Sequence, residues 1–315
     1  MATTLGTLRV AATRYGNRKL RNARRVRRVA IHVYRLAAEA NRFLPPPRML
    51  LNGHAKSGTH LLADCIALMP RTAFSGRHFT MDQFHRPGEE SWRESYSSSE
   101  PRPAIDSDRL RRFLQRCPQG MFVTAHAQYR PEMQAVLEQL GYRHVLLIRD
   151  PRDVAVSHTK FVLSEKWHFH HRFYANLPDD ETRLMATIEG FVPGQDGHGP
   201  PQAPLGESFR GFLRWLQVAG VHVARFEDLI GQRGGGSQGQ QISEIMRLGE
   251  FLQRPLSESQ AADIGERMYS KASLTYRKGI IGDWENHFTR EHREAFKRLA
   301  GDILIDLGYE RDEDW

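Results

Sequence analysis

A short loop near residue 56 combines side chains that could bind an anion. Residues 56–60 read Lys-Ser-Gly-Thr-His and follow an apolar run. A glycine lets backbone N–H groups turn toward a ligand, and a helix that begins here adds a partial positive charge. Lys56 adds a full charge. The pattern is typical of a phosphate or sulfate cradle, although an ordinary strand-to-helix turn with a surface lysine would look similar.

A second candidate anion site follows the apolar run at residues 144–148. Arg149 comes directly after it, Asp150 is a suitable N-cap, and Pro151 is a suitable first helical residue. We therefore expect Arg149 at the tip of a strand. Ser157 should then lie two turns into the next helix.

A third candidate site lies near the carboxyl end of the chain. Arg277 and Lys278 are adjacent and precede Gly279, within a segment that continues to Trp284. Two neighbouring cations before a flexible glycine can clamp a phosphate. The sequence thus offers three anion-binding segments far apart along the chain.

The elements that must bring these segments together are those of a parallel sheet. Short apolar runs alternate with helical patterns, which predicts an α/β fold: a P-loop-like parallel sheet flanked by helices. In such sheets, ligands bind beyond the carboxyl ends of the strands. The predicted strands cover residues 49–52, 121–124, 144–148 and 221–224, and the predicted helices cover residues 59–69, 131–140, 153–161, 209–218, 243–252 and 291–307.

Two stretches do not fit this alternation. Residues 75–108 are long, polar and aromatic without clear periodicity, so we predict a lid or an acceptor-binding insertion there. Residues 231–241 are rich in Gly and Gln. They contain too few apolar side chains to pack, which predicts a mobile loop.

The amino-terminal residues form a separate basic segment. The first acidic residue is Glu39, and residues 18–28 are dense in arginine, while apolar residues recur at three- to four-residue spacing up to residue 40. This predicts a basic amphipathic helix over residues 18–41, which could contact a membrane surface, act as a targeting segment or pack on the domain. Three prolines at 45–47 end it. We divide the chain into this segment, 1–47, and one α/β domain, 48–315.

Composition excludes several other classes of protein. No stretch approaches eighteen consecutive apolar residues, so a membrane-spanning helix is not expected. Only two cysteines occur, Cys65 and Cys117, which argues against a disulfide framework or a zinc site and favours a cytoplasmic location, with peripheral membrane contact through residues 18–41 as an option. The net charge of +8 favours anionic partners.

Taken in order from about Arg48 to the carboxyl terminus, the three segments closely resemble the cytosolic-type sulfotransferase family. Its signature includes a Lys-Ser-Gly-Thr loop, an Arg-Asp-Pro-Arg-Asp-like segment ending in Ser, and Arg-Lys-Gly-x-x-Gly-Asp-Trp. The resemblance implies transfer of a sulfonate group from 3′-phosphoadenosine 5′-phosphosulfate (PAPS) to a hydroxyl or amine. The product would be 3′,5′-adenosine bisphosphate (PAP), and no metal is expected.

The resemblance also implies roles for individual residues. Lys56 would stabilise the charge that grows on the departing phosphate oxygen, and Phe226 stands where the family often has a tyrosine near the adenine. The residues that would surround the 5′-phosphosulfate are Lys56, Ser57, Gly58, Thr59 and His60, and those that would hold the 3′-phosphate are Arg149, Ser157, Arg277, Lys278 and Gly279.

His126 is the candidate general base. It follows the apolar run at 121–124, so it should project from a strand tip, and it matches the position of the family's catalytic histidine. The alternative interpretation is a structural histidine that only bonds to local backbone at the end of a strand. Asp82, Glu89 and Glu90 are fallback bases.

The chain departs from the family pattern at several positions. Leu61 replaces a tryptophan and Phe226 a tyrosine, which leaves the stacking of adenine open. Thr124 replaces a lysine two residues before the histidine, which removes a positive charge near the sulfonate. Glu285 and Arg290 replace residues of the family's dimer motif, so we do not carry its dimer over.

The acceptor and two alternative functions stay open. Residues 166–172 are aromatic and basic, which favours an acceptor wall over a metal site, and small-molecule, carbohydrate and glycolipid acceptors all fit. A P-loop phosphotransferase would need Gly-Lys-Ser rather than Lys-Ser-Gly. A noncatalytic nucleotide- or nucleic-acid-binding protein would not explain three ordered anion segments and His126, so we expect no nucleic-acid partner.

Overall fold

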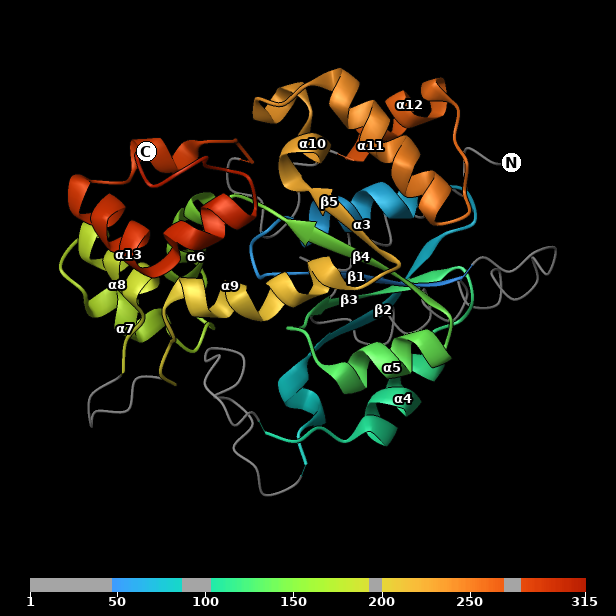
Figure 1. Ribbon diagram of the computed structural model, residues 1–315, viewed down its shortest axis with the longest axis horizontal. Helices are drawn as coiled ribbons and strands as arrows, with labels where there is room; N and C mark the ends of the chain where they lie inside the picture. The colour runs from blue at the N-terminus through green and yellow to red at the C-terminus, as the bar shows by residue number, and fades with distance from the viewer. Residues whose placement is uncertain (1–46, 87–102, 193–199, 269–278) are drawn as a thin grey trace.

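In the part of the chain that the structure describes, the central element is a sheet of five parallel strands (Figure 1). The computed structural model describes residues 47–86, 103–192, 200–268 and 279–315. The strands lie in the order β2-β3-β1-β4-β5. Their bounds are β1 Arg48–Gly53, β2 Ala73–Thr80, β3 Met121–His126, β4 Tyr142–Ile148 and β5 Val221–Arg225.

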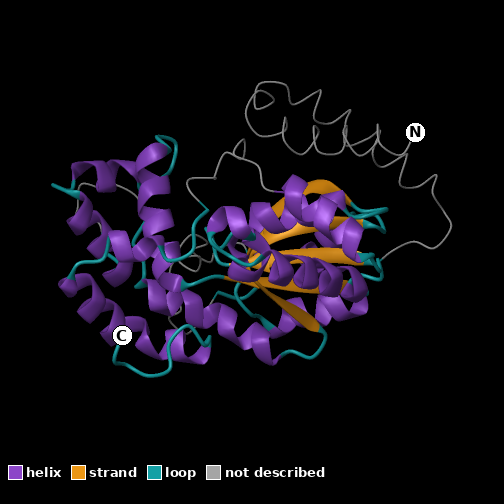
Figure 2. Cartoon of the chain, turned by 90° about the horizontal axis from the view of Figure 1, so that it is seen from above, coloured by secondary structure: helices purple, strands orange, loops and turns teal. Residues whose placement is uncertain are grey.

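Both faces of the sheet are covered by helices, because alternate residues of the central strands point to opposite sides. In β1, Met49 and Leu51 join one apolar cluster and Leu50 joins the other. Figures 1 and 2 show the resulting layers. The first cluster includes residues of α3 (Thr59–Leu68), α11 (Gln238–Phe251) and α12 (Glu258–Met268), and the second includes residues of α4 (Ser107–Gln115), α5 (Pro131–Gln139) and α9 (Leu205–Leu213).

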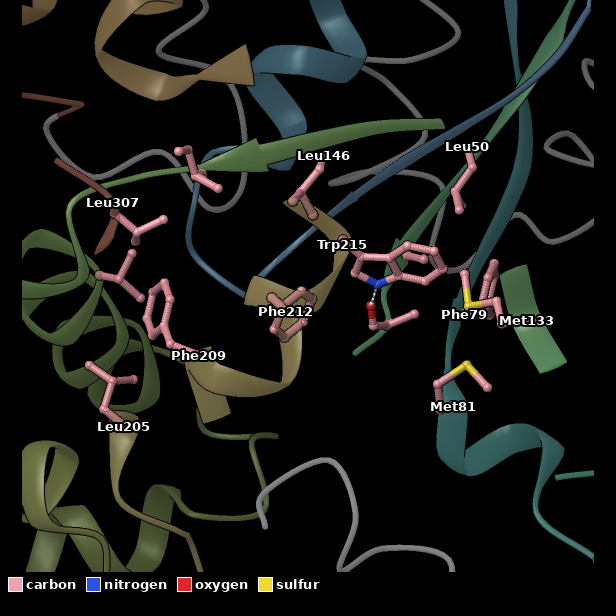
Figure 3. Close-up of a cluster of buried hydrophobic side chains, with 14 of the residues drawn as sticks. Leu50, Phe79, Met81, Met133, Leu146, Leu205, Phe209, Phe212, Trp215 and Leu307 are labelled. Carbon is pink, nitrogen blue, oxygen red and sulfur yellow. Dashed lines mark hydrogen bonds between the residues drawn. The ribbon is translucent and has the colours of Figure 1, made fainter. Parts of the chain in front are cut away.

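Trp215 anchors the second cluster at the point where β3 ends (Figure 3). Its side chain is 1% exposed and belongs to η3 (Arg214–Gln217). The indole Nε1–H donates to the backbone oxygen of Ala127 at 3.1 Å. The Asn52 amide donates to the same oxygen at 2.8 Å and its Oδ1 accepts from the Ala127 N–H at 2.9 Å. The backbone next to His126 is therefore held from two sides.

A further group of helices lies beyond the end at which β4 finishes (Figure 1). Within it, α6 and α13 both contact α8, and α13 also contacts α9. The bounds are α6 Pro151–Ser164, α7 His171–Asn176, α8 Asp180–Glu189 and α13 Arg290–Asp306. Asp150 caps α6 by accepting from the N–H of Arg152, as the sequence predicts.

The structure confirms the α/β class and corrects two predictions. Residues 75–108 are not wholly an insertion, because β2 and η1 (Met81–Phe84) occupy their first part and α4 begins at Ser107. Residues 231–241 pack instead of forming a loose loop. Backbone contacts replace the missing apolar side chains: the Ile281 N–H donates to Gly234 O at 2.9 Å, and a side chain at Gly234 would clash with Gly279 O.

Several short helical elements lie in the remaining described segments. They are α10 (Phe226–Ile230), η4 (Gln232–Gly234) and η5 (Asp283–Asn286). The predicted basic helix at 18–41 lies outside the described residues, as do Glu89, Glu90, Arg277 and Lys278. Among the helices that the structure describes, none is long and apolar enough to cross a membrane.

Candidate functional site

The loop between β1 and α3 has the backbone of an anion cradle. Lys56 has φ 73° and Gly58 has φ 98°, both in the left-handed region, and the Ser57 N–H donates to His54 O at 3.1 Å. A Cβ on Gly58 would lie 2.5 Å from Cδ2 of Phe226. The loop therefore turns tightly over the Phe226 ring, and only glycine fits there without displacement.

Two hydroxyl groups in this loop are buried. Ser57 Oγ and Thr59 Oγ1 have no partner within the residues that the structure describes. A buried unpaired hydroxyl costs free energy, on the order of 1–3 kcal/mol. An anion bound at the start of α3 would accept from both groups and remove this cost.

Arg149 joins the loop to the carboxyl-terminal segment. Its Nη1 donates to Lys56 O at 3.4 Å and its Nη2 donates to Ile280 O at 3.2 Å. The guanidinium also lies over the Phe226 ring, 4.1 Å from the centroid. Its Nε is buried without a hydrogen bond among the described residues. Arg149 thus connects all three predicted anion segments: its own, the Lys56 loop and the segment after Gly279.

Asp153 fixes the segment that follows Gly279. Its carboxylate accepts from the N–H of Gly282 and from the N–H of Trp284, each at 3.0 Å. The same carboxylate lies 3.7 Å from Nη2 of Arg149. Gly279 is therefore brought to the same end of the sheet as Arg149, and Ser157 lies one turn farther along α6, buried.

His126 is oriented by the backbone of β1. Its Nδ1 lies 2.8 Å from Gly53 O. A carbonyl oxygen only accepts, so Nδ1 carries the hydrogen and Nε2 has a free lone pair. Burial, followed by the nearby His78, lowers the pKa of His126 to about 3 from the usual 6.5. The imidazole is therefore neutral at pH 7, with one nitrogen able to take up a proton.

A second histidine, which the sequence did not connect with His126, lies beside it. The ring centroids of His78 and His126 are 4.9 Å apart, edge to face. Nothing in the sequence pattern indicated this contact, because residues 75–108 show no strand periodicity. Of the other predicted residues, His60 is exposed on the first turn of α3, and Asp82 lies in η1.

A cluster of aromatic side chains begins at Phe161, which lies against Lys56. The Lys56 ammonium lies over the Phe161 ring, 4.0 Å from the centroid. That ring packs against Trp167 and His168, with centroids 6.0 and 5.8 Å away. Trp167 is 58% exposed and Phe169 is 43% exposed. No group of carboxylate, thiol and imidazole side chains in the described part of the chain could hold a metal ion.

Comparison with known proteins decides the family. The family model described as "Sulfotransferase domain" matches residues 46–308, most of the chain. The chain belongs to the sulfotransferase family. The resemblance found in the three anion segments is thereby confirmed, and with it the fold that the family implies.

Curated sulfotransferases are similar at low identity. The chain is 24% identical over 221 residues to a flavonol sulfotransferase-like protein of Flaveria bidentis, a match covering 59% of this chain and 62% of the relative. It is 26% identical over 167 residues to the 3-alpha-hydroxysteroid sulfotransferase of Cavia porcellus, covering 49% and 53%. It thus spans less than two thirds of both. Human Sulfotransferase 2A1 is 22% identical, with 81% and 83% covered.

Solved sulfotransferase structures share the fold. Mouse sulfotransferase SULT7A1, complexed with PAP, matches with a TM-score of 0.53 and 17% identity, covering 84% of this chain and 86% of that one. Retinol dehydratase, in a complex with retinol and PAP, matches with a TM-score of 0.50 and 20% identity, covering 83% and 82%. At these identities the likeness establishes the parallel α/β architecture.

Proposed function

We propose that the chain transfers the sulfonate group of PAPS to a hydroxyl or amine acceptor. The observation that carries this proposal is Arg149, which bonds both to the Lys56 loop and to the segment after Gly279. A donor with phosphates at both the 3′ and 5′ positions needs two anion sites at a fixed separation. The solved relatives in complex with PAP support the same ligand.

The residues present fit the donor. At the 5′ end, Lys56 would supply a positive charge, and the hydroxyls of Ser57 and Thr59, which have no partner among the described residues, would supply hydrogen bonds. At the 3′ end, Arg149, Ser157 and Gly279 would act together with Arg277 and Lys278. Phe226 would lie between the two sites, beneath Gly58 and Arg149. When bound, the donor supplies an activated sulfonate group.

His126 would serve as the general base. The acceptor oxygen forms a bond to sulfur while the bond from sulfur to the phosphate oxygen breaks, with its electron pair left on that oxygen. The acceptor proton moves to Nε2 of His126, the nitrogen that the Gly53 hydrogen bond leaves free. Lys56 stabilises the negative charge on the departing oxygen.

The pKa of His126 also favours its role as the general base. A pKa of about 3 keeps His126 unprotonated in the free protein. The negative charges of a bound donor would raise that pKa toward neutrality, because an opposite charge favours the imidazolium. His126 would then become a stronger base when the donor is in place.

A small organic alcohol or phenol is the acceptor class that we favour. The names of the relatives point to flavonol and hydroxysteroid acceptors. The exposed Trp167 ring packs against Phe161, which lies under Lys56, and the exposed Phe169 ring stacks on His168; together they could hold a hydrophobic ring system. Carbohydrate and glycolipid acceptors are the other members of an acceptor screen.

The test is calorimetric binding of PAP, compared with AMP and with ATP plus magnesium. We expect tight binding of PAP that is lost without the 3′-phosphate and is independent of magnesium. Preference for magnesium ATP would indicate a phosphotransferase, and absence of PAP binding would refute the proposal. A screen with labelled sulfonate would then identify the acceptor.

A further inference from the structure

The strand register places His78 next to the reacting centre. In the parallel pair of β2 and β3, His78 is opposite Thr124, and Thr80 is opposite His126. Alternate residues of a strand share a face, so these four side chains stand on one face of the sheet at its carboxyl edge. The edge-to-face contact between the His78 and His126 rings follows from this arrangement.

An irregularity in β2 is what brings the imidazole there. Phe74 is opposite Phe122, and the next paired residue of β2 is His78, opposite Thr124. Four residues of β2 therefore span the same distance as two residues of β3. An uninterrupted register would place Gly76, which has φ 73°, opposite Thr124. Bulges often re-aim a side chain beside a functional site.

Thr124 selects the tautomer of His78. Its Oγ1 lies 3.0 Å from His78 Nδ1, and this is the one hydrogen bond that the described residues give either side chain. Thr124 is 9% exposed, so a hydroxyl hydrogen without an acceptor would be costly. The hydroxyl therefore donates, Nδ1 accepts, and the hydrogen of the neutral His78 ring is on Nε2.

We propose that His78 is a further catalytic residue, which donates a hydrogen bond from Nε2–H to an oxygen of the sulfonate group. This inference rests on the proposed function. The two neighbouring imidazoles are then complementary: His126 presents a lone pair to the acceptor proton, and His78 presents a hydrogen to the group being transferred. Such a donor stabilises the charge on the sulfonate oxygens without a metal ion.

The surroundings of His78 favour contact with a ligand over a purely structural role. The side chain is exposed, although its partner Thr124 is almost fully buried. An exposed side chain adds little to the stability of the fold. An exposed ring that is held in one orientation by its Nδ1 hydrogen bond is instead suited to bind a ligand.

The experiment compares the affinities of PAPS and PAP, which differ only in the sulfonate group. Calorimetry is done on the wild type, on His78→Ala and on Thr124→Val, with His222→Gln as a matched control elsewhere in the sheet. We expect the affinity of His78→Ala for PAP to be unchanged and its affinity for PAPS to fall about tenfold, or about 1.4 kcal/mol. Thr124→Val should show a smaller loss in the same direction, and the control none.

Nitrogen-15 NMR of the imidazole rings gives a readout that needs no ligand. We expect the Nε2–H tautomer at His78 and the Nδ1–H tautomer at His126. An unchanged ratio of PAPS to PAP affinity in His78→Ala, or an Nδ1–H tautomer at His78, would overturn the inference while leaving the proposed function intact. A wild type that binds neither nucleotide would overturn both.

Discussion

At the scale of single residues, the site depends on which nitrogen of each imidazole carries a hydrogen. Gly53 O decides this for His126, because a carbonyl oxygen can only accept. The sequence predicted that His126 would stand at a strand tip, and the structure agrees. It did not predict the carbonyl that orients the ring, since Gly53 lies 73 residues earlier in the chain.

Replacing His126 should separate catalysis from donor binding. We expect His126→Ala to keep its affinity for PAP and to lose roughly 100-fold or more in transfer rate, the usual contribution of a general base. His126→Asn can still donate to Gly53 O but cannot accept the proton, so it should be equally slow. Transfer of labelled sulfonate to an acceptor from the screen measures this. Normal turnover in either variant would remove His126 from the base role.

At the scale of secondary-structure elements, the loop from β1 to α3 requires glycine at position 58 for two reasons. The φ of 98° is strained for any other residue, and a Cβ would meet the Phe226 ring at 2.5 Å. The sequence predicted this loop well, because its glycine and lysine follow a clear apolar run. The contact with Phe226 could not be predicted, since it depends on β5 pairing with β4 and on α10 following β5 directly.

Gly58→Ala tests whether the clash with Phe226 matters in addition to the backbone strain. Gly141 also has a positive φ, of 64°, but a Cβ there would meet nothing within 4 Å. Gly141→Ala should therefore carry only the backbone strain, about 1–2 kcal/mol of unfolding free energy. We expect Gly58→Ala to lose more stability than this and to weaken PAP binding at least tenfold, as measured by denaturation and calorimetry. Equal losses in both variants, with PAP binding unaffected, would show that the Phe226 contact is unimportant.

Of the five strands in the described residues, four were predicted from their apolar runs and β2 was not. In β2 the alternation is broken by the bulge between Phe74 and His78, which inserts polar residues where a regular strand would alternate. The missed strand carries His78, so the part of the site that the sequence failed to predict follows directly from the missed element. The prediction of a mobile loop at residues 231–241 was wrong for a different reason. These residues pack through backbone contacts rather than through apolar side chains.

At the scale of the whole molecule, burial keeps many imidazoles neutral. Desolvation lowers the pKa of His144 to about 3, and both of its ring nitrogens are buried without a hydrogen bond in the described chain. Burial also lowers the pKa of His54 and of His170 to about 4. The fold therefore contains bases that can be protonated far more easily when the chain is unfolded.

Acid should consequently destabilise the protein well above pH 4. Because the folded pKa of His144 lies below 6.5, its contribution to stability is complete above that pH and is lost as the pH falls toward about 3. His144→Leu should remove this pH dependence. The free energy of unfolding of the wild type, relative to that of His144→Leu, should therefore fall by about 1.4 kcal/mol between pH 7.5 and pH 5.5. Urea unfolding at both values measures it. Val145→Ala, a neighbouring core change without a titrating group, should cost the same at each pH; a pH-independent difference for His144→Leu would contradict the prediction.

Arg149 has a consequence for how the protein is made. Its two backbone partners lie 93 residues before it and 131 residues after it along the chain. During synthesis, the Lys56 loop and Arg149 emerge from the ribosome long before Ile280 does. A nascent chain can thus form most of the sheet while this connection is still missing, and the complete nucleotide site forms only after the last segment has docked. Binding of the nucleotide therefore indicates that the segment containing Ile280 has docked.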